Sequence, residues 1–95
     1  MKKFSFSGKV FVWPGGLGWY FVYLPKDLVE KIKKNSSVHG AGFVKIKATV
    51  GKTDWQTSLF PFKRENTFLI CIKKSVREKE DVFPGEEIKV SFSLI

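Results

Sequence analysis

Alternating apolar and polar residues predict β-strands along most of the chain. Segment 43–50 alternates apolar residues with lysine and threonine, and segment 86–94 does so with lysine and serine. Because successive side chains of a strand point to opposite faces, each of these segments is expected to bury one face. The same period, or a short apolar and β-branched run, predicts further strands at 4–13, 19–24, 53–60 and 67–72. The fold class is therefore mainly β, with about six strands.

Two short segments have the pattern of helices instead. After Pro25, the apolar residues Leu28, Val29 and Ile32 recur at helical spacing between lysines, which predicts an amphipathic helix. The segment from Lys73 to about Lys79 is polar and compatible with a helix of one or two turns. There Ser75 is the candidate N-cap and Val76 the single apolar anchor.

The two halves of the chain, about 1–50 and 51–95, resemble each other. At an offset of 48, Val22 meets Ile70, Leu28 meets Val76, and Glu30-Lys31 meets Glu78-Lys79. An offset of about 49 places Phe4, Phe6 and Val10 over Thr53, Trp55 and Leu59. Each half then contains two strands, a short helix and a strand. Such halves are expected to intertwine about a pseudo-two-fold axis into one small closed or pseudo-closed barrel, although chance similarity between β-rich halves is the alternative.

Length and composition fit one folded domain over residues 1–95. The chain has 95 residues, 43% of them hydrophobic and 16% aromatic, which is enough apolar material for a core. Its 17 lysine and arginine residues exceed 9 acidic ones, giving a net charge of +8. A charge of this sign admits nucleic acid or another anionic partner, but outward lysines on strands also serve solubility.

The residue inventory also narrows the classes of function. Cys71 is the only cysteine and His39 the only histidine, so neither a disulfide within the chain nor a structural zinc site is expected. No set of nucleophile, base and orienting group stands out, so the chain is expected to be non-catalytic and to need no cofactor. It contains no apolar stretch near the roughly 18 residues that cross a bilayer, and we expect a cytoplasmic protein, monomeric or weakly dimeric, with no membrane partner.

Several segments resemble the domain-of-unknown-function family numbered 1905 (DUF1905). The specific parts are Trp55-Gln56-Thr57-Ser58-Leu59-Phe60-Pro61 and Lys73-Lys74-Ser75-Val76-Arg77. The family pattern also agrees with Phe21-Val22-Tyr23-Leu24-Pro25 and with the glycines at residues 16, 18, 40, 42, 51 and 85. The chain departs from the family pattern at Cys71-Ile72, where a proline is frequent, and at Glu86, where aspartate is usual.

The resemblance spans nearly the whole chain and implies a fold but no activity. The resemblance implies that the fold is a small double-split β-barrel, similar to two fused subunits of the swapped-hairpin AbrB type. This fold agrees with the repeat in the sequence. Some members carry a second domain linked in name to bacteriocin protection, which is absent from this sequence.

Two groups of residues are candidate sites. Lys73, Lys74 and Arg77, at the start of the second helix, are candidates for binding an anion, against the alternative of a solvated basic helix start. Trp55, Thr57 and Ser58 are candidates for a ledge that stacks a base or a sugar. Since Trp55 and Leu59 share a face, the alternative places Trp55 in the core.

The expected function is a binding module of unknown role. One alternative is a nucleic-acid-binding or regulatory module that contacts phosphates through lysines, because only Arg64 and Arg77 supply arginine for reading bases. A second alternative is a barrel for a small ligand or a protein, with Trp13, Trp19 and Trp55 along a groove. A third and weaker one is an enzyme that uses Lys73 or Lys74 as a perturbed amine.

Overall fold

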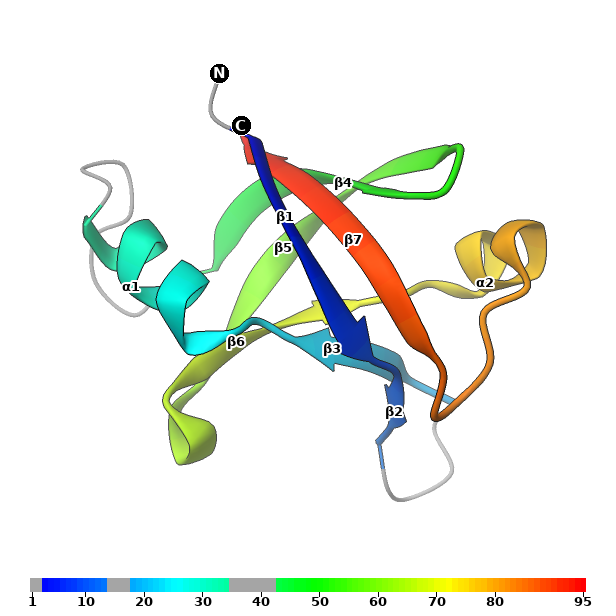
Figure 1. Ribbon diagram of the computed structural model, residues 1–95, viewed down its shortest axis with the longest axis horizontal. Coiled ribbons are helices and arrows are strands. Elements are labelled where there is room, and N and C mark those ends of the chain that lie inside the picture. Colours follow the sequence, from blue (N-terminus) through cyan, green and yellow to red (C-terminus); the bar gives the residue numbers. More distant parts are fainter. Residues whose placement is uncertain (1–2, 14–17, 35–42) are drawn as a thin grey trace.

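Over the residues that the structure describes, the protein is a curled, open antiparallel sheet of seven strands with two helices (Figure 1). The computed structural model describes residues 3–13, 18–34 and 43–95. In chain order the elements are β1 (Lys3–Lys9), β2 (Phe11–Val12), β3 (Tyr20–Tyr23), α1 (Lys26–Lys34), β4 (Val44–Val50), β5 (Thr53–Phe62), the 3-10 turn η1 (Lys63–Glu65), β6 (Thr67–Cys71), α2 (Lys74–Glu80) and β7 (Glu87–Leu94). The strands lie in the order β1-β7-β4-β5-β6-β3-β2.

The two edge strands of this sheet are consecutive pieces of the chain. β1 pairs with β7 and β2 pairs with β3, and only Val10 separates β1 from β2. Val10 donates from its backbone N to the carbonyl of Glu86 at 2.9 Å and accepts at its own carbonyl from Gly85 N at 2.8 Å. The predicted strand 4–13 therefore bends at Val10 and divides between the two ends of the sheet, which is why the described part of the chain has seven strands where about six were expected.

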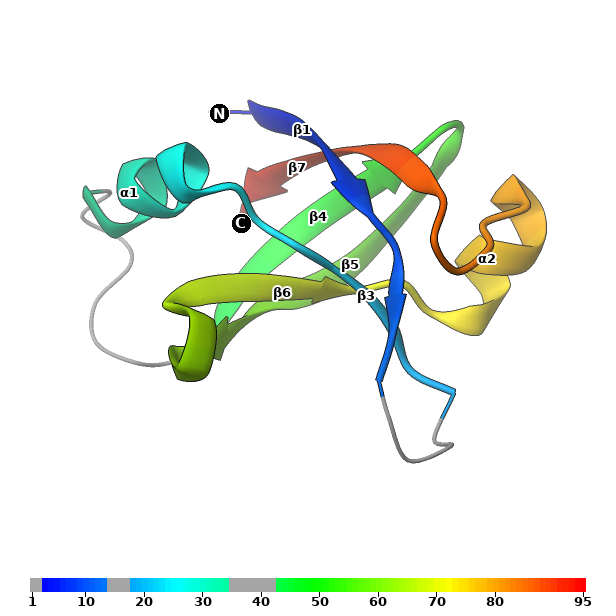
Figure 2. The same ribbon diagram turned by 60° about the horizontal axis from the view of Figure 1, so that its bottom comes forward.

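The curl brings distant strands over one another and encloses the core. Figure 2 shows β1 and β7 passing above β3 and β6. Apolar side chains on the concave side meet in the space between them, and Val22, Ile46, Leu59, Ile70, Val90 and Phe92 are all fully buried. The sheet is open and not closed, in contrast to the closed or pseudo-closed barrel that the sequence suggested.

The helices lie at opposite ends of the molecule (Figure 1), where α1 buries an apolar stripe and α2 buries a single apolar residue. Leu28, Val29 and Ile32 of α1 are buried, as the spacing predicted, and Val76 anchors α2. The residue at the N-cap of α2 is Lys73, without a side-chain cap, and Ser75 lies inside the first turn. The prediction that Ser75 caps this helix was therefore wrong. Among the described residues, neither helix is long and apolar enough to cross a membrane.

Glu80 fastens the end of α2 to the turn between β4 and β5. Its carboxylate accepts the hydroxyl of Thr53 at 2.6 Å and the backbone N–H of Lys52 at 3.3 Å. Gly51, in the same turn, has a φ of 59°, a left-handed conformation that favours glycine. A Cβ at this position would collide with the Glu80 carboxylate, so the glycine provides both the backbone conformation and the space for the contact.

Candidate functional site

The strands β3 and β6 are apolar on both faces, which is unusual for the outside of a small domain. Val22 pairs with Ile70, and both side chains lie in the core. The adjacent residues Phe21 and Leu69 are only 4% and 8% exposed, yet they lie outside that core cluster. Because strand side chains alternate between faces, Phe21 and Leu69 belong to a second apolar layer on the convex side of the sheet.

Aromatic rings cover this second layer. Phe21 has its ring centroid 5.5 Å from that of Trp13 and 5.9 Å from that of Phe11. Trp13 also meets Phe62, with 5.9 Å between centroids in an edge-to-face arrangement. These separations lie in the range in which aromatic pairs attract each other. The layer is therefore ordered by ring contacts, although it faces outward.

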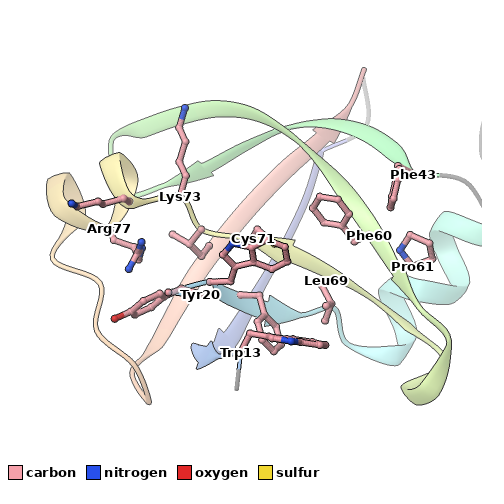
Figure 3. A pocket seen from close by; sticks show the side chains of 14 residues that line it. Trp13, Tyr20, Phe43, Phe60, Pro61, Leu69, Cys71, Lys73 and Arg77 are labelled. Atoms are coloured by element: carbon pink, nitrogen blue, oxygen red, sulfur yellow. The ribbon is translucent and has the colours of Figure 1, made fainter. Parts of the chain in front are cut away.

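A pocket of about 620 Å³ opens over the same layer (Figure 3). Leu69 and Cys71 of β6 and Phe21 of β3 lie along it, and Trp13, Phe43 and Phe60 surround it. The described residues that line it are Trp13, Gly18, Trp19, Tyr20, Phe21, Phe43, Phe60, Pro61, Leu69, Cys71, Ile72, Lys73, Lys74 and Arg77. Trp19 and Phe43 are 59% and 67% exposed, so apolar surface is available there to a bound molecule.

One end of the pocket is cationic. The three residues predicted to bind an anion, Lys73, Lys74 and Arg77, all line it, and they come from the start of α2. The guanidinium carbon of Arg77 lies 3.7 Å from the centroid of the Tyr20 ring, which is a cation–π contact. A backbone hydrogen bond of 2.8 Å from Ile72 N to the Tyr20 carbonyl fixes the two segments side by side.

Arg77 is held in a partly desolvated position. Its Nε is buried and has no hydrogen-bond acceptor within the part of the chain that the structure describes. Over the same residues, none of Lys73, Lys74 and Arg77 forms an ion pair. The cations at this end of the pocket are therefore not neutralised by neighbouring carboxylates.

Cys71 is a half-buried thiol in the pocket and not part of the core. Its place inside an apolar strand would favour a buried small hydrophobe, but Cys71 points to the same face of the sheet as Phe21 and Leu69, which is the convex side. Desolvation by burial raises the pKa of this thiol from its ordinary value of 9.0. The thiol is consequently a poor nucleophile at neutral pH.

The structure does not bring the second candidate group together. Trp55 is 6% exposed and belongs to the core, so its ring is not available for stacking on a ligand, and the alternative that it shares a buried face with Leu59 holds. Thr57 and Ser58 are half-buried on opposite faces of β5, and neither lines the pocket. Trp13 and Trp19, the other two tryptophans considered for a groove, do line it.

The remaining basic residues are spread over several elements. Lys45 and Lys47 of β4 and Lys89 of β7 are exposed on the polar part of the sheet, where Lys47 lies 3.9 Å from Asp54. Others lie on α1, η1 and α2. The sequence around His39 favours a loop, and the glycines at 15 and 16 favour a hairpin turn, but all three residues lie outside the described part of the chain.

Comparisons with known proteins place the chain in a family without an assigned activity. Among the described residues, no three histidine, cysteine, aspartate or glutamate side chains come together as a metal site would need. A search of curated proteins finds no match. The family described as "Domain of unknown function (DUF1905)" matches residues 6–92, nearly the whole length, in agreement with the resemblance seen in the sequence. The chain therefore belongs to the DUF1905 family.

Proposed function

We propose that this domain is a non-catalytic binding module and that the aromatic pocket takes a small, largely apolar ligand. The observation that carries the proposal is the pocket of about 620 Å³ on the convex side of β3 and β6. Sites for small molecules have volumes of roughly 300–1,000 Å³ and are lined mainly by apolar and aromatic side chains. The pocket meets both criteria with Trp13, Phe43 and Phe60.

The hydrophobic effect supplies the driving force for such binding. Each 100 Å² of apolar surface that ligand and pocket remove from water contributes about 2.5 kcal/mol. The buried residues Phe21 and Leu69 give the pocket a firm floor, and the ring contacts of Trp13 hold part of its wall. A preformed pocket loses little conformational entropy on binding, so more of this free energy appears as affinity.

The chemistry of the lining supports binding over catalysis. Its ionisable groups are the side chains of Lys73, Lys74 and Arg77, the hydroxyl of Tyr20 and the thiol of Cys71. The described lining contains no carboxylate or imidazole, the usual general bases. A thiol whose pKa is raised does not compensate for that lack.

The distribution of charge favours a pocket ligand over nucleic acid as the partner. A surface that follows a nucleic-acid backbone gathers lysine and arginine on one face. Here the basic residues lie on the sheet, on both helices and on η1, and the exposed pair Lys47 and Asp54 cancels part of the charge on the sheet.

A screen by NMR tests the proposal. Small aromatic and aliphatic compounds, neutral and charged, are added at up to millimolar concentration while backbone amide shifts are followed. At least one compound should shift amides of Phe21, Leu69 and Cys71, and a Cys71→Phe variant that fills the pocket should abolish the effect. Shifts of equal size in Cys71→Phe, or none at these amides with any compound, would refute the pocket as the site.

We also propose that the fold is a double-split barrel, opened at one side, whose halves 1–50 and 51–95 are related by duplication. The register supports this. At an offset of 48, the pair Val22 and Ile70 maps onto itself, and the pair Phe21 and Cys71 maps onto Leu69 and Tyr23. Ala48 and Phe92 pair with each other, and their partners on the next strands are Trp55 and Phe4. Trp55 is therefore the counterpart of Phe4, not of Phe6, because β1 contains two more residues before its bend than the matching part of β5.

An experimental structure tests the duplication. Superposition of β3, α1 and β4 on β6, α2 and β7 should require a rotation close to 180° about an axis through the pairs Val22–Ile70 and Ala48–Phe92. A different rotation, or paths that do not superpose, would contradict common descent of the halves.

A further inference from the structure

The cationic end and the apolar body of the pocket together specify a class of ligand. Lys73 and Arg77 lie at one end, and the aromatic rings of Phe43 and Phe60 lie away from them (Figure 3). A molecule that fills the pocket lengthwise therefore meets aromatic surface over most of its length and positive charge at one end.

Arg77 is prepared for an anion before any ligand arrives. Its guanidinium rests on the face of Tyr20, 3.7 Å from the ring centroid, and its Nε is buried. The stacking and the burial restrict the side chain, so less rotamer entropy is lost when the remaining guanidinium donors meet an acceptor. A partly desolvated cation also attracts an anion more strongly than a fully hydrated one does.

The lining rules against a ligand rich in donors. The polar side-chain groups of the described lining are the indoles of Trp13 and Trp19, the hydroxyl of Tyr20, the Cys71 thiol and the three cations. Indoles, lysine and arginine only donate hydrogen bonds, the thiol accepts weakly, and the Tyr20 hydroxyl is the one good acceptor among these side-chain groups. The hydroxyls of a sugar or the amino edge of a base would lose most of their acceptors on entering, at a cost in affinity.

We infer that the ligand of this pocket is a small organic anion, with a flat apolar body packed against the aromatic walls and a carboxylate or phosphate held by Arg77 and Lys73. The inference rests on the proposed function and deepens it by naming the ligand class. Arg77 is the residue that determines the preference for an anion, since its planar donors match either group in a bidentate manner.

Titration calorimetry with a matched set of probes tests the inference. 1-Naphthoate and 1-naphthamide have nearly the same shape and differ in charge, and 1-naphthyl phosphate separates phosphate from carboxylate as the preferred group. At roughly 50 mM salt, naphthoate or naphthyl phosphate should bind wild type at least about 10-fold more tightly than naphthamide, which is the scale of a charge-assisted hydrogen bond. The preference should shrink at high salt.

Variants on α2 assign the preference to a residue. In Arg77→Met, which removes the charge but keeps an unbranched apolar side chain, the preference for the anion should fall to within about 3-fold of unity. Lys79→Met removes the same charge from an exposed position of α2 that does not line the pocket, and should leave the preference unchanged. If Arg77→Met fails to fold, Lys73→Met takes its place.

The outcomes separate this inference from the proposed function. Equal binding of naphthoate, naphthyl phosphate and naphthamide would overturn the inference and leave a neutral apolar ligand for the pocket. An anion preference that persists in Arg77→Met, or that Lys79→Met lowers equally, would overturn the role of Arg77. Failure of all three probes to bind, together with a negative screen, would overturn both.

Discussion

Replacing two adjacent residues of β6 distinguishes the core from the pocket floor. Ile70 is fully buried between β3 and β5, and Leu69 faces the pocket on the other side of the sheet. Truncation to alanine removes three carbons from either residue, a loss of about 2.4 kcal/mol in transfer free energy. Ile70→Ala also leaves a closed cavity of about 50 Å³, which adds roughly 1 kcal/mol. Leu69→Ala only enlarges an open pocket.

Added bulk gives a sharper contrast at the same two positions. Ile70→Phe overpacks an enclosed site, and the free energy of unfolding should fall by at least about 1–3 kcal/mol. Leu69→Phe extends into the pocket, so the free energy of unfolding should change by less than about 0.5 kcal/mol, while binding of any pocket ligand weakens.

Urea unfolding followed by circular dichroism measures all four variants. Ile70→Ala should lower the free energy of unfolding by roughly 3–4 kcal/mol, and for a domain of this size each kcal/mol corresponds to about 4–8 °C in melting temperature. Equal losses for Leu69→Phe and Ile70→Phe would refute the reasoning, because they would place both residues in one closed core.

Three further predictions concern the turn at Gly51, the cap of α2 and the thiol in the pocket. Gly51→Ala should destabilise the fold more than Gly85→Ala, because both glycines have positive φ but only a Cβ at Gly51 meets the Glu80 carboxylate. Urea unfolding measures the difference in the free energy of unfolding. In a Glu80→Ala background the extra cost of Gly51→Ala should disappear. Asp81→Gly should raise the free energy of unfolding by about 0.5–1 kcal/mol, since Asp81 ends α2 with a φ of 52°, which glycine adopts without strain; an unchanged urea midpoint would contradict this. At pH 8, iodoacetamide should alkylate Cys71 more slowly in the folded protein than in the unfolded chain, and the rate should rise at higher pH than for an ordinary thiol. The reason is that the thiolate is the reactive form and burial raises the pKa of the thiol. Equal rates in the folded and unfolded chain would contradict the burial.

That raised pKa also fixes a sign for stability. The folded state holds the thiol proton more tightly than the unfolded chain does, so the contribution of Cys71 to stability is fully present below the unfolded pKa near 9.0 and declines as the pH rises through the folded pKa. A Cys71→Ser variant should lack this alkaline decline in stability.

The sequence predicted strands well where one face of the sheet is polar. Segment 43–50 alternates lysine and threonine with Ile46 and Ala48, and the structure has β4 over Val44–Val50 with those two residues buried. The bend at Val10 was not predictable in this way. Val10, Phe11 and Val12 form a continuous apolar run, and nothing in its pattern marks the point where the chain stops pairing with β7 and begins to pair with β3.

The residues of the candidate site are far apart in the sequence, and only the tertiary structure brings them together. The sequence separated the cations near Lys73 from Trp13 and Trp19, and these segments meet because β3 pairs with β6 across about 50 residues of chain. The burial of Trp55 in the core could be predicted from alternation along the strand, since Trp55 points to the same face as Leu59. Alternation along the strand also placed Phe21 and Val22 on opposite faces of the sheet, but a strand with two apolar faces gives no signal of which face is the core.

The indole protons of the three tryptophans test the pocket most directly. Trp13 and Trp19 line it, and Trp55 lies in the core on the other side of the sheet. In a ¹H–¹⁵N spectrum titrated with 1-naphthoate, the indole signals of Trp13 and Trp19 should shift with one saturating dissociation constant while that of Trp55 stays in place. Three signals that move together, or none that moves while naphthoate binds, would contradict an aromatic pocket with a cationic end as the binding site.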